Sequence, residues 1–147
     1  MMTTSDLRLG NWVYDSECTR YPMYVHTIGE DYVYLNFDGN EGDVFECKPE
    51  ELQGIPITEE LLTKMGARKV TDIGWNVVEY YNAGVRIELR VILFSESEID
   101  VKIRRSTPHW EDYFQGSSIH YLHELQNLYW DLTKQELKIK LYIISEH

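Results

Sequence analysis

Two histidines, His120 and His123, stand three positions apart in a segment with helical periodicity, and Glu124 follows directly. Residues three apart can share one face of a helix, and a neutral imidazole is a common metal ligand. His109 and Asp112, a few positions earlier, are the nearest further ligands. This spacing matches no established zinc motif, because a zinc-protease helix needs its second histidine four residues after the first. A metal-dependent hydrolase is therefore a minor alternative, and a buried, hydrogen-bonded His123 is the simpler expectation.

Two adjacent amides, Gln126 and Asn127, interrupt the otherwise apolar pattern of the same segment. Buried amides need hydrogen-bond partners, so these two either bridge to a loop or line a binding cleft. The aromatic residues nearby favour a core, although aromatics beside arginines can also stack nucleic-acid bases. The candidate binding surface consists of His123, Gln126, Asn127, Tyr129, Trp110 and Tyr113.

The first 55 residues alternate short β-type runs with turn signals. The runs are Trp12–Tyr14, Met23–Ile28, Tyr32–Phe37 and Val44–Cys47. Four short strands at close spacing predict a small antiparallel, SH3-like barrel. We take residues 1–55 as one β-rich portion.

The remaining 92 residues, 56–147, predict an α+β portion with two helices and four strands. Thr58 is a plausible N-cap of a helix that ends near Gly66. Three consecutive strands with period-two alternation follow, at Trp75–Tyr81, Val85–Phe94 and Ile99–Ile103. Residues 105–116 are expected to form a loop, Ser117 and Ser118 to cap the second helix, and residues 137–143 to form a last strand. The fold class is therefore α+β, with an antiparallel sheet packed against two helices, in two portions or one compact domain.

The net charge of −11 is unevenly distributed. Residues 1–55 contain eleven acidic and three basic residues, a net charge of −8, and the rest of the chain has a net charge of −3. The face of the later strands that we expect to point outward is basic, however. This basic face comprises Arg86, Arg90, Lys102, Arg104, Lys138 and Lys140. It predicts an anion-binding or acidic-protein surface, a solvated face with cross-strand ion pairs, or a docking face for the acidic portion.

Several classes of protein are not indicated. The chain contains no phosphate-binding glycine loop, nucleophile elbow or reactive-cysteine setting, so nothing supports enzymatic activity and no cofactor is expected. We expect no membrane association and a cytoplasmic protein, because there is no long apolar segment or secretory signal. Cys18 and Cys47 are expected to be free thiols in a reducing compartment.

Three ordered segments of this chain resemble a family of small uncharacterised proteins from Bacteroides-type bacteria and their phages. They are Asp6–Val13 (with Leu-Arg-Leu-Gly-Asn), Ile55–Gly66 (with Pro-Ile-Thr-Glu-Glu) and Tyr121–Thr133 (with His-Glu-Leu-Gln-Asn-Leu-Tyr). Leu61 and Lys134 stand where that family commonly has tryptophan and glycine. The resemblance implies a phage or mobile-element setting and no particular activity.

These observations favour a non-enzymatic accessory protein that binds another protein through the candidate binding surface. Nucleic-acid binding through the basic face is the second hypothesis, because phosphate attraction needs clustered lysine and arginine. The metal-dependent hydrolase is the third. The oligomeric state stays open.

Overall fold

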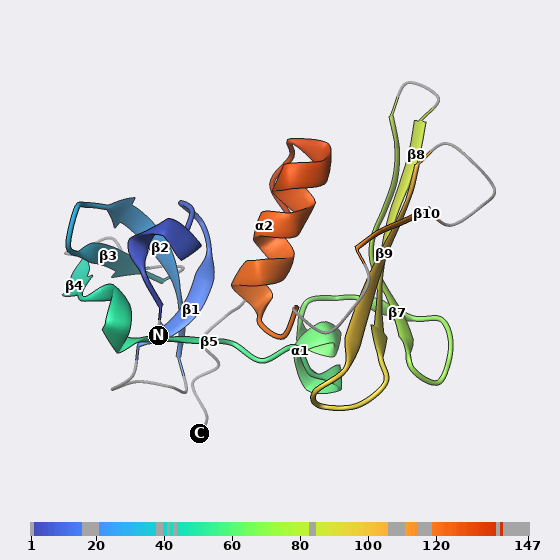
Figure 1. The fold of residues 1–147 in the computed structure, drawn as a ribbon, viewed down its shortest axis with the longest axis horizontal. Helices are drawn as coiled ribbons and strands as arrows, with labels where there is room; N and C mark the ends of the chain where they lie inside the picture. Colours follow the sequence, from blue (N-terminus) through green and yellow to red (C-terminus); the bar gives the residue numbers. More distant parts are fainter. Residues whose placement is uncertain are drawn as a thin grey trace. The chain divides into compact units, whose positions relative to one another are not determined.

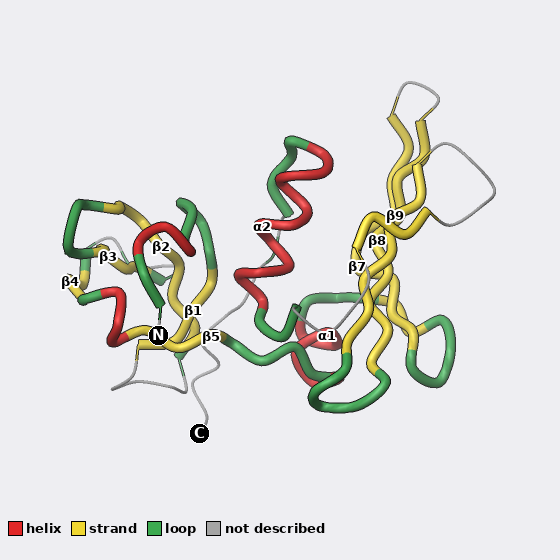
Figure 2. The backbone as a smooth tube through the Cα atoms, in the orientation of Figure 1, coloured by secondary structure: helices red, strands yellow, loops and turns green. Residues whose placement is uncertain are grey.

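The computed structural model describes residues 2–15, 21–37, 40, 42, 44–82, 85–105, 111–114, 119–137 and 139. Figure 1 colours the elements along the chain, and Figure 2 colours them by type. The chain divides into two compact units: unit 1 comprises Met1–Pro56 and Tyr121–His147, and unit 2 comprises Ile57–His120. From the sequence pattern alone, residues 56–147 are expected to form one portion. In the structure the second helix belongs to the same unit as the N-terminal strands, and its polar contacts are with residues 6–12.

Unit 1 contains one open antiparallel sheet with the strand order β4-β3-β2-β1-β5. Its strands are β1 (Trp12–Asp15), β2 (Pro22–Ile28), β3 (Val33–Asn36), β4 (Phe45–Cys47) and β5 (Leu52–Gly54). A short 3-10 helix, η1 (Thr4–Asp6), precedes β1, and a second one, η2 (Pro49–Glu51), lies between β4 and β5 in sequence. The four expected strands are confirmed. The SH3-like barrel is not confirmed, because β4 and β5 are the two ends of the order and do not close the sheet.

One face of this sheet forms an apolar core. Val13, Val25, Val33 and Leu35 are at most 1% exposed and come from three neighbouring strands. Alternation along β3 puts Tyr34 on the opposite face from Val33 and Leu35, as the period-two pattern predicts. The buried cluster comprises Leu7, Val13, Met23, Val25, Val33, Leu35, Cys47 and Leu52.

The second helix of the chain, α2 (Leu122–Thr133), belongs to unit 1. It begins after Tyr121, whose N–H donates to Glu124 Oε1 at 3.0 Å. The predicted caps, Ser117 and Ser118, lie outside the described residues. The helix ends at Lys134, which adopts the left-handed conformation (φ 58°) that glycine usually provides.

Unit 2 begins with the short helix α1 (Glu59–Lys64). The expected N-cap is confirmed, because Thr58 Oγ1 accepts a hydrogen bond from Leu61 N at 3.1 Å. Gly66 follows the helix with φ 82°, in the left-handed region that ends helices.

The sheet of unit 2 is an antiparallel meander in the order β10-β9-β8-β7-β6. Its strands are β6 (Arg68–Lys69), β7 (Gly74–Asn82), β8 (Val85–Leu93), β9 (Ile99–Arg105) and β10 (Glu111–Phe114). The three alternating strands are confirmed as β7, β8 and β9. Within the expected loop 105–116, Glu111–Phe114 forms a strand paired with β9. The expected last strand, residues 137–143, lies largely outside the described residues.

Both faces of this sheet bury residues near its middle. Trp75, Val91 and Val101 are opposite one another in register and are buried. On the other face Glu88 is also buried, at 1% exposed, so the expectation of an outward face is wrong at this position. A period-two pattern reports the polarity of a face and carries no information on what covers it.

Candidate functional site

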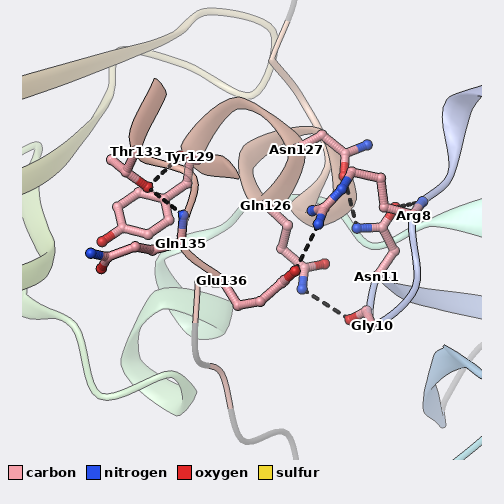
Figure 3. A network of polar contacts seen from close by, with 9 residues as sticks. All are labelled: Arg8, Gly10, Asn11, Gln126, Asn127, Tyr129, Thr133, Gln135 and Glu136. Carbon is pink, nitrogen blue, oxygen red and sulfur yellow. Dashed lines mark hydrogen bonds and ion pairs between the residues drawn. The ribbon is translucent and has the colours of Figure 1, made fainter. Parts of the chain in front are cut away.

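Helix α2 is joined to the segment Asp6–Trp12 by the amide side chains predicted as candidate site residues (Figure 3). Gln126 Oε1 accepts from the N–H of Trp12 at 2.8 Å, and Gln126 Nε2 donates to the carbonyl of Gly10 at 3.1 Å. The side chain is only 3% exposed. Gln126 therefore satisfies two main-chain groups at the start of β1, in the way that a neighbouring strand would.

Asn127 extends the same contact by one residue. Its Nδ2 donates to the carbonyl of Asp6 at 3.1 Å, and its Oδ1 accepts from Asn11 Nδ2 at 2.9 Å. Asn11 Oδ1 in turn accepts from the N–H of Arg8 at 2.7 Å, which fixes the turn before β1. We call the contacts of Gln126 and Asn127 with residues 6–12 the amide clamp. Of the two interpretations left open by the sequence, the structure supports bridging to a loop.

Arg8 lies beside the clamp and contacts the far end of α2. Its Nη2 forms an ion pair with Glu136 Oε1 at 2.7 Å, and its guanidinium carbon lies 4.3 Å from the centre of the Trp130 ring. Nη1 is buried and has no hydrogen-bond partner among the described atoms. This arrangement adds a cation–π contact to an exposed ion pair, so Arg8 packs the helix as well as neutralising charge.

His123 is buried in the same helix, at 5% exposed. Its ring stacks on that of Tyr121 with a centre-to-centre distance of 6.0 Å. Burial lowers the pKa of His123 below its usual 6.5, and the charges of Glu124 and Asp6 oppose that shift more weakly. Nδ1 has no hydrogen-bond partner in the described structure. The expected burial is thus confirmed.

The metal hypothesis gains no support from the described residues. No group of three or more histidine, cysteine, aspartate or glutamate side chains among them could hold an ion. His120 is half-buried, and His109 and the side chain of Asp112 lie outside the described part.

The candidate binding surface is largely internal. His123, Gln126 and Tyr129 are each at most 5% exposed, so these three side chains do not form a solvent-facing surface. Trp110 and the side chain of Tyr113 lie outside the described residues. Of the described members of the candidate binding surface, Asn127 alone is half-buried rather than buried.

The basic face can be followed at only two of its side chains. Arg90 and Lys102 face each other across β8 and β9, and both are half-buried. Arg90 Nε donates to Asn76 Oδ1 at 3.0 Å. Lys138, Lys140 and the side chains of Arg86 and Arg104 lie outside the described residues, so this face stays a prediction.

Strands β3 and β4, at one end of the unit 1 sheet, carry a surface that sequence reasoning missed. Tyr34 donates to Glu46 Oε1 at 2.9 Å, and this hydrogen bond, together with the carboxylate charge, raises the pKa of Tyr34 above 10.0. Tyr32 and Phe45 are 39% and 44% exposed. We call Tyr32, Tyr34, Phe45 and Glu46 the edge patch, in which Tyr34 and Glu46 lie on one face of the sheet and Phe45 lies on the other. Its signal in the sequence is local: residues 30–51 contain eight acidic residues and one basic residue, with aromatics among them.

Comparison with known proteins gives no relative for this chain: no family model, curated protein or solved structure matches it. None of the described helices has the length and apolar character needed to cross a membrane.

Proposed function

We propose that this chain is a non-enzymatic accessory protein that acts by binding another protein. The observation that carries the proposal is the edge patch, where Tyr32 and Phe45 are exposed at one end of the sheet and the half-buried Tyr34 donates to the exposed Glu46. Aromatic residues are enriched in protein interfaces and provide much of their binding energy. On the basis of the family resemblance, we propose that the protein belongs to a phage or an integrated element. We propose that it acts in the cytoplasm.

The two amides of the candidate binding surface, Gln126 and Asn127, form hydrogen bonds within unit 1. Two of the three segments behind the resemblance, Asp6–Val13 and Tyr121–Thr133, contact each other through the amide clamp. Their amides join α2 to the segment before β1, which supports a structural role for these side chains. This supports a scaffold whose function lies in its surface.

The proposal can be tested by reconstitution. The tagged chain would be expressed in a Bacteroides-type host during phage induction, and its bound proteins recovered after nuclease treatment. We expect one of them, once purified, to bind the chain in a fixed stoichiometry by calorimetry. Failure of every recovered protein to bind after purification would contradict the proposal. Direct binding of the purified chain to nucleic acid that weakens steeply with salt would support the basic-face alternative instead.

A further inference from the structure

Strand β4 is an end of the unit 1 sheet. Among the described strands it pairs with β3, and nothing follows it in the order β4-β3-β2-β1-β5. An end strand presents main-chain N–H and C=O groups that can pair with a further strand. Sheets bind extended peptides in this way, with main-chain hydrogen bonds providing affinity and alternate side chains providing specificity.

The two faces of β4 differ in chemistry. Glu46 is opposite Tyr34 in register and accepts its hydroxyl, so a carboxylate and a phenol lie together on one face. Phe45 points to the other face, where its ring stacks on Phe37 at a centre-to-centre distance of 6.1 Å. A strand added beside β4 would place its own side chains alternately beside Glu46 and beside Phe45.

The charge around β4 has one predominant sign. Glu30 and Asp31 precede β3, while Glu50 and Glu51 lie in η2 directly after β4, and all four are exposed. Lys48 is the one basic residue between positions 30 and 51. A positively charged ligand would therefore be attracted, and an acidic one repelled.

We propose that β4 is the docking edge for an extended segment of a partner protein in which lysine or arginine alternates with apolar residues. The cationic side chains lie beside Glu46 and the faces of Tyr32 and Tyr34, where ion pairing and cation–π attraction combine. The apolar side chains cover Phe45. This inference rests on the proposed function and adds the site, the binding mode and the class of partner segment.

Labelled synthetic peptides test the inference directly. The probe is a fluorescent eight-residue peptide of alternating lysine and valine, titrated against the full chain and followed by anisotropy. We expect it to bind at least about tenfold more tightly than the same peptide with glutamate in place of lysine. Two further peptides carry N-methyl groups on the lysines or on the valines. Since alternate N–H groups of a strand point to the same side, one of these should lose binding and the other should keep it.

Matched charge-reversal variants locate the site. Glu46→Lys should weaken binding of the lysine–valine peptide about fivefold or more, whereas Glu96→Lys should leave it unchanged. Both variants replace a glutamate by a lysine, so they have the same net charge. Glu96 is an exposed residue of unit 2. Far-ultraviolet circular dichroism and thermal unfolding check that both variants fold. Phe45→Ser provides a second variant at the site, with loss of binding expected.

Four outcomes would overturn the inference: equal binding of the lysine and glutamate peptides, equal loss in Glu46→Lys and Glu96→Lys, retention of binding by both N-methylated peptides, or self-association of the chain that Glu46→Lys abolishes. The first would show binding that does not depend on the charge of the peptide, the second would show that the site is not at Glu46, and the third would show binding without strand pairing. The last would make a second copy the occupant. A partner found by reconstitution that binds Glu46→Lys normally would leave the proposed function intact and reject this edge as its site.

Discussion

At the scale of single residues, Gln126 connects two parts of the chain that are 114 positions apart. A methylene chain and one amide provide both the acceptor for Trp12 N–H and the donor for the Gly10 carbonyl. Because the side chain is buried, its removal takes both partners away at a site shielded from bulk water. The two main-chain groups would then remain unsatisfied, at about 1–3 kcal/mol each.

We therefore expect Gln126→Ala to lower the free energy of unfolding of unit 1 by about 2–4 kcal/mol. Urea denaturation followed by tryptophan fluorescence would measure it. Gln53→Ala is the matched control, because Gln53 is an exposed residue of β5, and its effect should be within about 0.5 kcal/mol. Similar losses in both variants would show that the clamp adds little.

His123 predicts how stability depends on pH. Its pKa is lowered in the folded chain, mainly by burial, so the unfolded chain binds the proton first as pH falls. The free energy of unfolding should therefore decrease as pH is lowered below 6.5, the unfolded value, and should be unaffected by this group above it. His123→Leu should remove that part of the pH dependence between pH 7 and 5, measured by denaturation at each pH. An unchanged slope in the variant would contradict the assignment.

At the scale of elements, β5 and the residue before α2 fit closely. A methyl group at Gly54 would lie 2.7 Å from Tyr121 Cδ1, too near for an ordinary contact. Tyr121 also pairs with Pro56, two residues after Gly54, in an isolated antiparallel bridge. Glycine at position 54 is therefore required by a neighbouring ring and not by its backbone angles.

A double-mutant cycle tests this fit. Gly54→Ala should lower the free energy of unfolding by about 1–3 kcal/mol in the natural background, because the methyl group overpacks the contact. In a Tyr121→Ala background the same change should have an effect smaller by at least about 0.5 kcal/mol. Thermal unfolding of the four proteins would measure the coupling. Additive effects would mean that the ring moves aside at no cost.

How far the elements could be predicted depended on their length and pattern. The long alternating strands β7, β8 and β9, and the helix start at Thr58, could be predicted because each has a strong local signal. Strands β5, β6 and β10 have two to four residues, too few for a period to be detected, whereas the equally short β1 and β4 could be predicted from the turn signals between the β-type runs. The helix α2 could be predicted as a helix, but its partner could not.

Prediction of the candidate site was limited in the same way, because a local sequence pattern does not identify distant partners. Buried amides at Gln126 and Asn127 signalled that hydrogen-bond partners must exist. No local pattern identifies those partners, because they are main-chain groups more than one hundred positions earlier. The edge patch was overlooked for a different reason: its residues gain meaning only when the order of strands shows that β4 is at an end.

At the scale of the whole molecule, unit 2 is an insertion between two parts of unit 1. The chain leaves and re-enters through adjacent segments, since Ile57 N donates to the His120 carbonyl at 3.0 Å and Leu122 N donates to the Ile55 carbonyl at 2.9 Å. Insertions of this kind are tolerated where their ends are close together.

We expect unit 1 to fold after residues 57–120 are replaced by a two-residue Asn-Gly turn. Its amide nuclear magnetic resonance spectrum should keep the dispersion of a folded sheet, with cooperative urea unfolding. A chain truncated after residue 120 is the contrasting protein, because it lacks α2 and the clamp, and its unit 1 should unfold at lower urea. Loss of cooperative folding in the Asn-Gly protein would refute the independence of unit 1.

The discontinuity of unit 1 also sets an order of events during synthesis. A ribosome adds roughly 5–20 residues per second, so the strands at the N-terminus emerge seconds before the helix that completes them. During that interval Gln126 has not been synthesised, so the main-chain groups of Gly10 and Trp12 lack the hydrogen bonds that they have in the folded chain. All of unit 2 is made in the meantime. A segment that is translated after unit 2 is thus needed to complete the part of unit 1 that was translated before it.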